Sequence, residues 1–226
     1  MNNSFLNKIK KIYSSIYIFF KTKVLRDSHM VTINQWFKNN GDSTLRIDYS
    51  LDENSIVFDV GGYMGEWSEN IINRYNPTVY IYEPIKKYYD QIAEKFKSNK
   101  KVLVCHFGLS DANKETNINL LEDASSIHGE GDKKETIRLV NFSDFIKEKN
   151  INKVDLIKIN IEGAEYDLLE GMIKDGSIKI CHNIQVQFHR SMLDSKNRRD
   201  KIRESLNKTH FITYDYPFVW ENWRKK

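Results

Sequence analysis

From residue 55 onward, short apolar segments alternate with helical segments, and this alternation constrains the fold more than any other feature of the chain. Segments 56–60, 78–82, 102–107 and 154–161 are apolar and rich in β-branched and aromatic residues, which is typical of buried strands. Parallel strands require crossover connections, usually helices. The alternation therefore predicts an α/β fold with a mostly parallel, doubly wound sheet covered on both faces.

The C-terminal segment predicts a closing antiparallel hairpin, because strand-like residues 211–214 and 218–220 flank a Tyr-Pro pair. Residues 111–135 are polar and predict irregular structure, and residues 137–140 predict one additional strand. A further strand is expected within residues 178–188. The predicted helices cover residues 66–74, 86–97, 142–149, 164–174 and 194–206.

Residues 1–50 precede the alternation and predict an N-terminal helical extension to a domain at residues 51–226. Residues 1–26 contain six basic residues and no acidic one. Because the whole chain has a net charge of +4, the remaining residues together have a net charge of −2. A near-neutral body of this kind argues against a nucleic-acid partner.

Within residues 5–26, apolar residues recur at helical spacing beside lysines. This pattern predicts an amphipathic helix that either packs on the domain or lies on an anionic membrane surface. Its apolar run is shorter than the roughly 20 residues that a membrane span needs. Cys105 and Cys181 lie in strand-like segments and predict buried thiols. Together these features predict a cytoplasmic protein, with possible peripheral contact at the inner face of the membrane.

A glycine-rich turn, Asp59-Val60-Gly61-Gly62-Tyr63-Met64-Gly65, follows the first strand and precedes a helix. Glycines permit a tight turn and close approach of a ligand, and a helix N-terminus offers free N–H groups. The spacing only partly matches the dinucleotide fingerprint, because Val60 occupies the place of its first glycine. An NAD-type oxidoreductase is therefore a weaker alternative. A further alternative is that the glycines form an ordinary strand-to-helix turn with no ligand.

An acidic residue directly before this turn suits S-adenosylmethionine (SAM), whose amino and sulfonium groups are cationic. We expect Asp59 to hold that end of the cofactor. Glu83 lies 18 residues after Gly65, at the end of the second strand. A carboxylate at that place accepts hydrogen bonds from ribose hydroxyls.

Four motifs, in order, resemble those of the FkbM-type SAM-dependent methyltransferases. Residues 57–65 resemble the family's opening motif, and Tyr82-Glu83-Pro84 resembles its second-strand element. Gly108-Leu109-Ser110-Asp111 and residues 155–165 resemble two later motifs. The resemblance implies a Rossmann-like class I methyltransferase fold, SAM as cofactor, and O-methyl transfer, often onto sugars or secondary metabolites. The cofactor-binding residues expected on this basis are Asp59, Gly61, Gly62, Tyr63, Gly65, Glu83, Pro84 and Ser110.

Two residues depart from the family pattern. Asn160 stands where the family usually has Asp, and Gln187 stands where Glu is common. Both replacements remove a negative charge, and hard divalent cations prefer carboxylate ligands. A metal-assisted mechanism is therefore weakened, although Glu162 remains, and we assign no metal ligands. A non-catalytic SAM-binding accessory protein stays an alternative.

Three residues after buried strands are candidates for catalysis. His189 follows the strand at 184–188 and is the candidate base, since an unperturbed histidine is mostly neutral at cytoplasmic pH. Asn160 and Glu162 follow the strand segment at 155–159 and could orient the acceptor or the SAM amino group. The structural alternatives are a strand-capping histidine and a glutamate that binds N–H groups at the next helix.

Two further segments could contact the acceptor. Ser125, Ser126 and His128 could form a lid over the cofactor or a plain surface loop. The aromatic run that ends at Trp223 could pack as a strand or stack exposed rings on a sugar. The sequence thus predicts a methyltransferase whose partner is a small-molecule or glycan acceptor.

Overall fold

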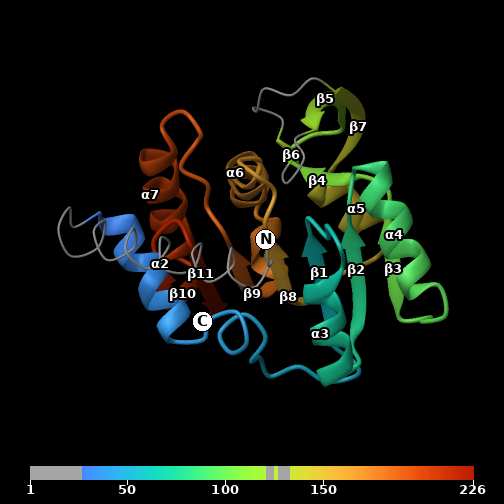
Figure 1. The fold of residues 1–226 in the computed structure, drawn as a ribbon, viewed down its shortest axis with the longest axis horizontal. Coiled ribbons are helices and arrows are strands. Elements are labelled where there is room, and N and C mark those ends of the chain that lie inside the picture. The colour runs from blue at the N-terminus through green and yellow to red at the C-terminus, as the bar shows by residue number, and fades with distance from the viewer. Residues whose placement is uncertain (1–26, 121–124, 127–132) are drawn as a thin grey trace, which may run out of the picture. The chain divides into compact units, whose positions relative to one another are not determined.

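The computed structural model describes residues 27–120, 125–126 and 133–226 (Figure 1). The chain divides into two compact units, Met1–Arg46 and Ile47–Lys226. In the first unit, helix α2 (Ser28–Lys38) begins where the Asp27 side chain accepts hydrogen bonds from the backbone N–H groups of His29 and Met30. The predicted amphipathic helix at residues 5–26 lies outside the described residues.

The predicted domain boundary at residue 50 stays a prediction. Tyr49 contacts strands of the second unit: its hydroxyl accepts a hydrogen bond from Gln185 Nε2 at 2.6 Å and donates one to Asn222 Oδ1 at 3.1 Å. Residues 47–50 therefore contribute contacts to the sheet. Among the residues that the structure describes, no helix is long and apolar enough to cross a membrane.

Within the described residues of the second unit, seven strands form one sheet in the order β10-β11-β9-β8-β1-β2-β3. Strand β11 runs antiparallel to both its neighbours, and the other pairs are parallel, which confirms the predicted parallel sheet with a C-terminal antiparallel hairpin. The strands are β1 (Ile56–Val60), β2 (Thr78–Tyr82), β3 (Val102–Cys105), β8 (Val154–Ile159), β9 (Cys181–Val186), β10 (His210–Tyr216) and β11 (Trp220–Lys225).

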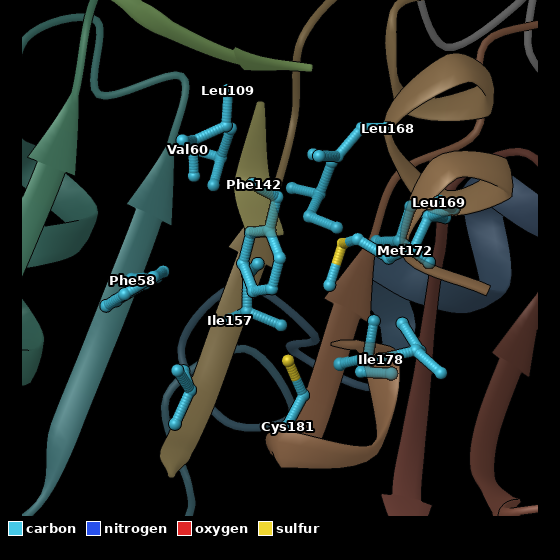
Figure 2. Close-up of a cluster of buried hydrophobic side chains, with 14 of the residues drawn as sticks. Phe58, Val60, Leu109, Phe142, Ile157, Leu168, Leu169, Met172, Ile178 and Cys181 are labelled. Carbon is cyan, nitrogen blue, oxygen red and sulfur yellow. The ribbon is translucent and has the colours of Figure 1, made fainter. Parts of the chain in front are cut away.

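Helices cover both faces of this sheet because the side chains of its central strands alternate between two apolar clusters. Val57 of β1 packs with Ile71 and Ile92, whereas the next residue, Phe58, packs in the larger cluster with Phe142 and Ile157. Figure 2 shows this larger cluster between the sheet and the helix that carries Leu168, Leu169 and Met172. The helices are α3 (Glu66–Tyr75), α4 (Lys86–Phe96), α5 (Phe142–Glu148), α6 (Glu165–Asp175), α7 (Ser195–Leu206) and the short 3-10 helix η2 (Ser177–Ile180).

The described segments between β3 and α5 form a second, four-stranded sheet in the order β4-β7-β5-β6. The prediction of irregular structure for residues 111–135 is therefore wrong for the described residues 114–120, 125–126 and 133–135, which form strands, and the strand predicted at 137–140 is the end of a longer one. Ile118 is buried while its neighbours are more exposed, so polar residues face solvent without ending the strand. The strands are β4 (Gly108–Ser110), β5 (Lys114–Leu120), β6 (Ser125–Ser126) and β7 (Lys133–Asn141).

A matched pair of leucines tests this assignment of the core. Leu156 on β8 is fully buried, whereas Leu103 on the edge strand β3 is 40% exposed. We expect Leu156→Ala to lower the free energy of unfolding by about 2–5 kcal/mol, because it leaves a cavity in close-packed surroundings. Leu103→Ala should lower it by about 1 kcal/mol or less. Urea unfolding followed by circular dichroism measures both, and equal losses would contradict the central position of β8.

Candidate active site

A cavity of about 240 Å³ lies where β1, β2 and β8 end. In parallel α/β sheets, ligands bind beyond the carboxyl ends of the strands. Val60, Glu83 and Asn160, each at or just beyond the end of one of these strands, contribute to its lining. Figure 1 shows the second sheet beyond the arrowheads of β1 and β2, and side chains of β5 and β7 complete the cavity wall.

The turn after β1 has room only for glycine at two positions. Gly61 has a φ of +89°, and a Cβ atom there would lie 2.1 Å from the backbone oxygen of Asn160. At Gly62 an added Cβ would lie 2.4 Å from the Ile81 side chain. The N–H groups of both glycines donate to the Tyr82 carbonyl, so the turn is bonded to the end of β2. Of the two, Gly61 lines the cavity, and Gly62 packs behind it.

Asp59 is not among the cavity-lining residues, because its side chain is buried between β1 and α3. Lys158 Nζ donates to its Oδ1 at 2.8 Å, and Ser68 Oγ donates to its Oδ2 at 2.6 Å. Lys158 Nζ also donates to the Gly61 carbonyl at 2.7 Å. These bonds hold the turn in place, and the direct contact of Asp59 with the cofactor stays a prediction.

Glu83 lines the cavity and is nearly fully buried. Its Oε2 accepts from the Tyr63 N–H at 2.9 Å, and its Oε1 accepts from the Ile85 N–H at 3.0 Å. Burial raises the pKa of Glu83 to about 7, although these two hydrogen bonds act in the opposite direction. Each oxygen keeps a further lone pair, so this carboxyl can accept hydrogen bonds from a ligand.

Other expected cofactor residues lie around Glu83. Tyr63 is 51% exposed, has a φ of +49°, and places its ring 4.7 Å from that of Tyr88. Tyr63 and Pro84 line the cavity, and Gly65, with a φ of +71°, is the N-cap residue of α3. Ser110 is not among the lining residues, and its hydroxyl donates to Asp111.

Asn160 and Glu162 line the cavity on the side of β8. Among the contacts of the described residues, the buried Oδ1 atom of Asn160 has no hydrogen-bond partner. A buried acceptor without a partner is costly, so a donor from a ligand would stabilise this arrangement. Glu162 has a φ of +50° and a side chain that is 42% exposed, and its contact with His189 lowers its pKa.

His189 is not among the cavity-lining residues, and its ring lies between two carboxylates. Nε2 is 3.4 Å from Glu162 Oε2, and Nδ1 is 3.2 Å from Glu165 Oε1. Burial lowers the pKa of His189, but the hydrogen bonds and charges of these carboxylates outweigh it and raise the pKa to about 9. The expectation of a neutral His189 is therefore corrected, because the raised pKa favours the protonated ring at neutral pH, whereas a catalytic role of this residue stays a prediction.

The apolar wall of the cavity was missed from the sequence. Ile85 and Tyr88 of the α4 region pack with Ile118, Ile137 and Leu139 of the second sheet, and all five line the cavity. The signal was the alternation of apolar and polar residues within 116–120 and 135–139, which polar flanking residues obscured. For the predicted lid, Ser125 and Ser126 form β6 and His128 lies outside the described residues.

The C-terminal aromatic run packs as strands. Trp220 and Trp223 are buried, and Trp223 Nε1 donates to Glu221 at 3.2 Å. The alternative hypothesis, that exposed rings of this run stack on a sugar, is therefore wrong for these two tryptophans.

The cavity suits SAM by the chemistry of its groups. Glu83 would accept from ribose hydroxyls, a donor on a ligand would satisfy the partnerless Asn160 Oδ1, and the wall with Ile118 would contact the adenine ring. Carboxylate acceptors and apolar lining are the complement of a cationic, partly aromatic ligand.

Fold and site together define a class I methyltransferase-like domain. Residues 59–213 match the methyltransferase FkbM domain, and the chain belongs to this family. The protein is therefore a SAM-dependent methyltransferase. No curated protein matches the chain.

Several solved structures are similar to the chain at low identity. A putative rRNA methylase from Clostridium thermocellum has a TM-score of 0.50 and 10% identity, over 77% of this chain and 88% of that one. The Methanococcus jannaschii fibrillarin pre-rRNA processing protein has a TM-score of 0.48 and 14% identity, over 79% and 69%. TrmK of M. capricolum, in complex with S-adenosylhomocysteine, has a TM-score of 0.47 and 14% identity, over 78% and 65%. At such identities the likeness shows the fold alone.

Gly61 provides a test of the turn, with Gly176 as its matched control. Both have a left-handed φ, but an added Cβ at Gly176 meets nothing within 4 Å. We expect Gly61→Ala to weaken binding of S-adenosylhomocysteine by at least about 10-fold, because the added Cβ must displace the turn. A tenfold loss of affinity corresponds to about 1.4 kcal/mol. Gly176→Ala should lose about 1–2 kcal/mol of stability from strain and keep its affinity. Calorimetric titration and thermal unfolding measure both, and unchanged affinity in Gly61→Ala would contradict the turn as the binding site.

Glu83 predicts a pH dependence of cofactor binding. Its pKa of about 7 makes the group neutral below and charged above that value, and the carboxylate is the better acceptor for ribose hydroxyls. Affinity for S-adenosylhomocysteine should therefore rise as the pH rises through about 7. The stability of the unliganded protein should instead fall as the pH rises through about 7. A carboxyl group whose pKa is raised in the folded state stabilises that state only while it is protonated. Glu83→Gln should bind more weakly without this rise, and a profile like that of the native protein would exclude Glu83 as its cause.

Proposed function

We propose that the protein transfers the methyl group of SAM to a hydroxyl oxygen of a sugar or glycan precursor. The observation that carries the proposal is Glu162, a partly exposed carboxylate beside Asn160 at the cavity. A carboxylate and an amide offer the acceptor atoms that hydroxyl groups bind. The FkbM-type resemblance supports the same acceptor class.

Positioning supplies most of the rate enhancement in this proposal. When bound, SAM supplies a methyl group already activated by a positive sulfur. Asn160 and Glu162 orient the acceptor hydroxyl toward it, and such alignment contributes roughly 7–11 kcal/mol. A general base adds typically about 10²–10⁴-fold.

Glu162 takes the role of proton acceptor, since His189 is already protonated at neutral pH. As the new C–O bond forms and the C–S bond breaks, the acceptor oxygen becomes that of a protonated ether. Such an ether is far more acidic than a carboxylic acid, so even the lowered pKa of Glu162 suffices for it to receive the proton. The balanced products are the methyl ether, S-adenosylhomocysteine and one proton, which passes from Glu162 to solvent.

Charge around the site favours a neutral, hydroxyl-rich acceptor over a nucleic acid. Among the described residues that line the cavity, the charged side chains are Glu83 and Glu162. A nucleic acid requires Lys or Arg for its phosphates. The arginines of α7 are engaged in ion pairs with acidic residues of α6, β10 and β11: Arg198 with Asp167 and Glu170, and Arg199 and Arg203 with Asp215 and Glu221. Membrane contact through residues 5–26, and a location at the inner face of the membrane, stay part of the proposal.

A methyl-transfer assay with labelled SAM tests the proposal. The acceptors offered are nucleotide sugars, methyl glycosides and glycan fragments. We expect O-methyl ethers, identified by mass spectrometry and by their resistance to mild base. Glu162→Gln should lower turnover by about 10²-fold and leave affinity for S-adenosylhomocysteine unchanged. Glu204→Gln, an exposed residue on α7, is the matched control and should change neither quantity.

Three outcomes would overturn parts of the proposal. Labelled RNA or an N-methylated product would replace the acceptor class. Full turnover in Glu162→Gln would remove its role. Cofactor binding with no transfer to any hydroxyl would instead favour the non-catalytic SAM-binding accessory protein.

A further inference from the structure

Glu165, the first residue of α6, joins two loops at the edge of the candidate site. Its side chain is fully buried. Oε2 accepts from the Gly163 N–H at 2.8 Å, within the loop after β8. Oε1 accepts from the His189 N–H at 2.7 Å, within the loop after β9. One carboxylate therefore binds the backbone of both loops.

The His189 ring extends this connection to Glu162. Nδ1 lies 3.2 Å from Glu165 Oε1, and Nε2 lies 3.4 Å from Glu162 Oε2. A protonated imidazole donates from both nitrogens, so it can bridge two carboxylates. Tyr166 adds a further bond, since its hydroxyl donates to the His189 carbonyl at 2.8 Å. The order Glu165, His189, Glu162 thus leads from a buried anchor to the cavity.

The backbone near Glu162 needs such an anchor. Glu162 has a φ of +50°, which is uncommon for a residue with a long side chain, and Gly163 has a φ of +107°. Conformations of this kind persist where surrounding contacts over-determine them. The bond from Glu165 to the Gly163 N–H and the contact of the His189 ring with Glu162 supply such contacts to both residues of the turn.

We propose that Glu165 is a positioning residue that, through the bridging ring of His189, holds the Glu162 carboxylate at the cavity. The role of Glu162 toward the acceptor rests on the proposed function, whereas the three-residue connection does not. A plain helix-start carboxylate would account for the bond to Gly163. It would not account for the contacts of Glu165 with the His189 ring or for the opposite contact of that ring with Glu162.

Titration of the His189 ring by NMR, in the full chain, separates the two roles. Among the described residues, Glu162 and Glu165 are the titratable groups in contact with the ring, and the Tyr166 hydroxyl binds the backbone carbonyl of the same residue. We expect the native ring to titrate near 9. Glu165→Gln and Glu162→Gln should each lower the midpoint by about 1–3 pH units, because each removes an adjacent negative charge. His189→Gln assigns the signal, and Glu204→Gln is the control that should leave it unchanged.

Kinetics supply the second readout, with the hydroxyl acceptor found in the methyl-transfer screen. Glu165→Gln should lower kcat by up to about 10²-fold, the effect of misplacing a reacting group by about 1 Å. The Kd of S-adenosylhomocysteine should change by no more than about twofold, which is well below the tenfold change that 1.4 kcal/mol produces. Glu165→Asp, which keeps the charge on a shorter side chain, should recover part of the loss.

Several results would overturn the proposal. A native ring that titrates near its unperturbed value would show that the bridge does not form. A Glu165→Gln protein with an unchanged midpoint would reduce Glu165 to a structural residue. If that variant does not fold, Glu162→Gln alone decides, since Glu162 is partly exposed and its removal must still lower the midpoint. Failure to find a hydroxyl acceptor would refute the proposed function, whereas the ring titration would still decide whether the bridge forms.

Discussion

A buried ion pair between Asp59 and Lys158 joins the two central strands of the sheet at the edge where the cavity lies. The two residues are register partners on β1 and β8, and their charged atoms lie 2.8 Å apart. Desolvation of two charges is costly, so such a pair is tolerated where further hydrogen bonds satisfy both groups. Here Ser68 on α3 and the Gly61 carbonyl complete the set. Removal of one partner from a pair of this kind typically costs about 3–5 kcal/mol, because the other charge is left buried and unpaired.

The geometry of the cofactor cavity follows from this pair. Lys158 holds the Gly61 carbonyl, while the Gly61 N–H donates to Tyr82 at the end of β2. The turn is thus bonded to β8 on one side and to β2 on the other. Its next residues then place the Tyr63 N–H on Glu83, whose carboxyl is fixed in the cavity wall. The strand, the turn and Glu83, which lies 20 positions after Tyr63, act as one unit because each connection includes a backbone group.

The strands of the main sheet were predictable because they are apolar runs bounded by turn residues, and the glycine turn was predictable because its spacing is local. The partner of Asp59 was not. Lys158 lies 99 residues away, within a buried strand, and only the register of β1 on β8 makes the two neighbours. The same limit applies to the second sheet, where Ile118 and Ile137 meet Tyr88 across a tertiary contact that short polar segments conceal. Glu165 stood inside a recognised motif, but the sequence alone gave no measure of its burial.

Environment, more than residue type, decides what the titratable groups of this site can do. A histidine considered alone predicts a base near neutral pH, but two adjacent carboxylates keep the His189 ring protonated and make it a bridge. Two glutamates on the same cavity are driven in opposite directions: burial raises the pKa of Glu83, and the contact with His189 lowers that of Glu162. Separation of pKa values within one site distinguishes the roles of chemically identical groups. At neutral pH, Glu162 is ionised on the side of β8, while Glu83 is near its midpoint on the side of β2. In the proposed reaction, a proton released by the acceptor would therefore pass to Glu162, away from the carboxyl group that is expected to bind the ribose.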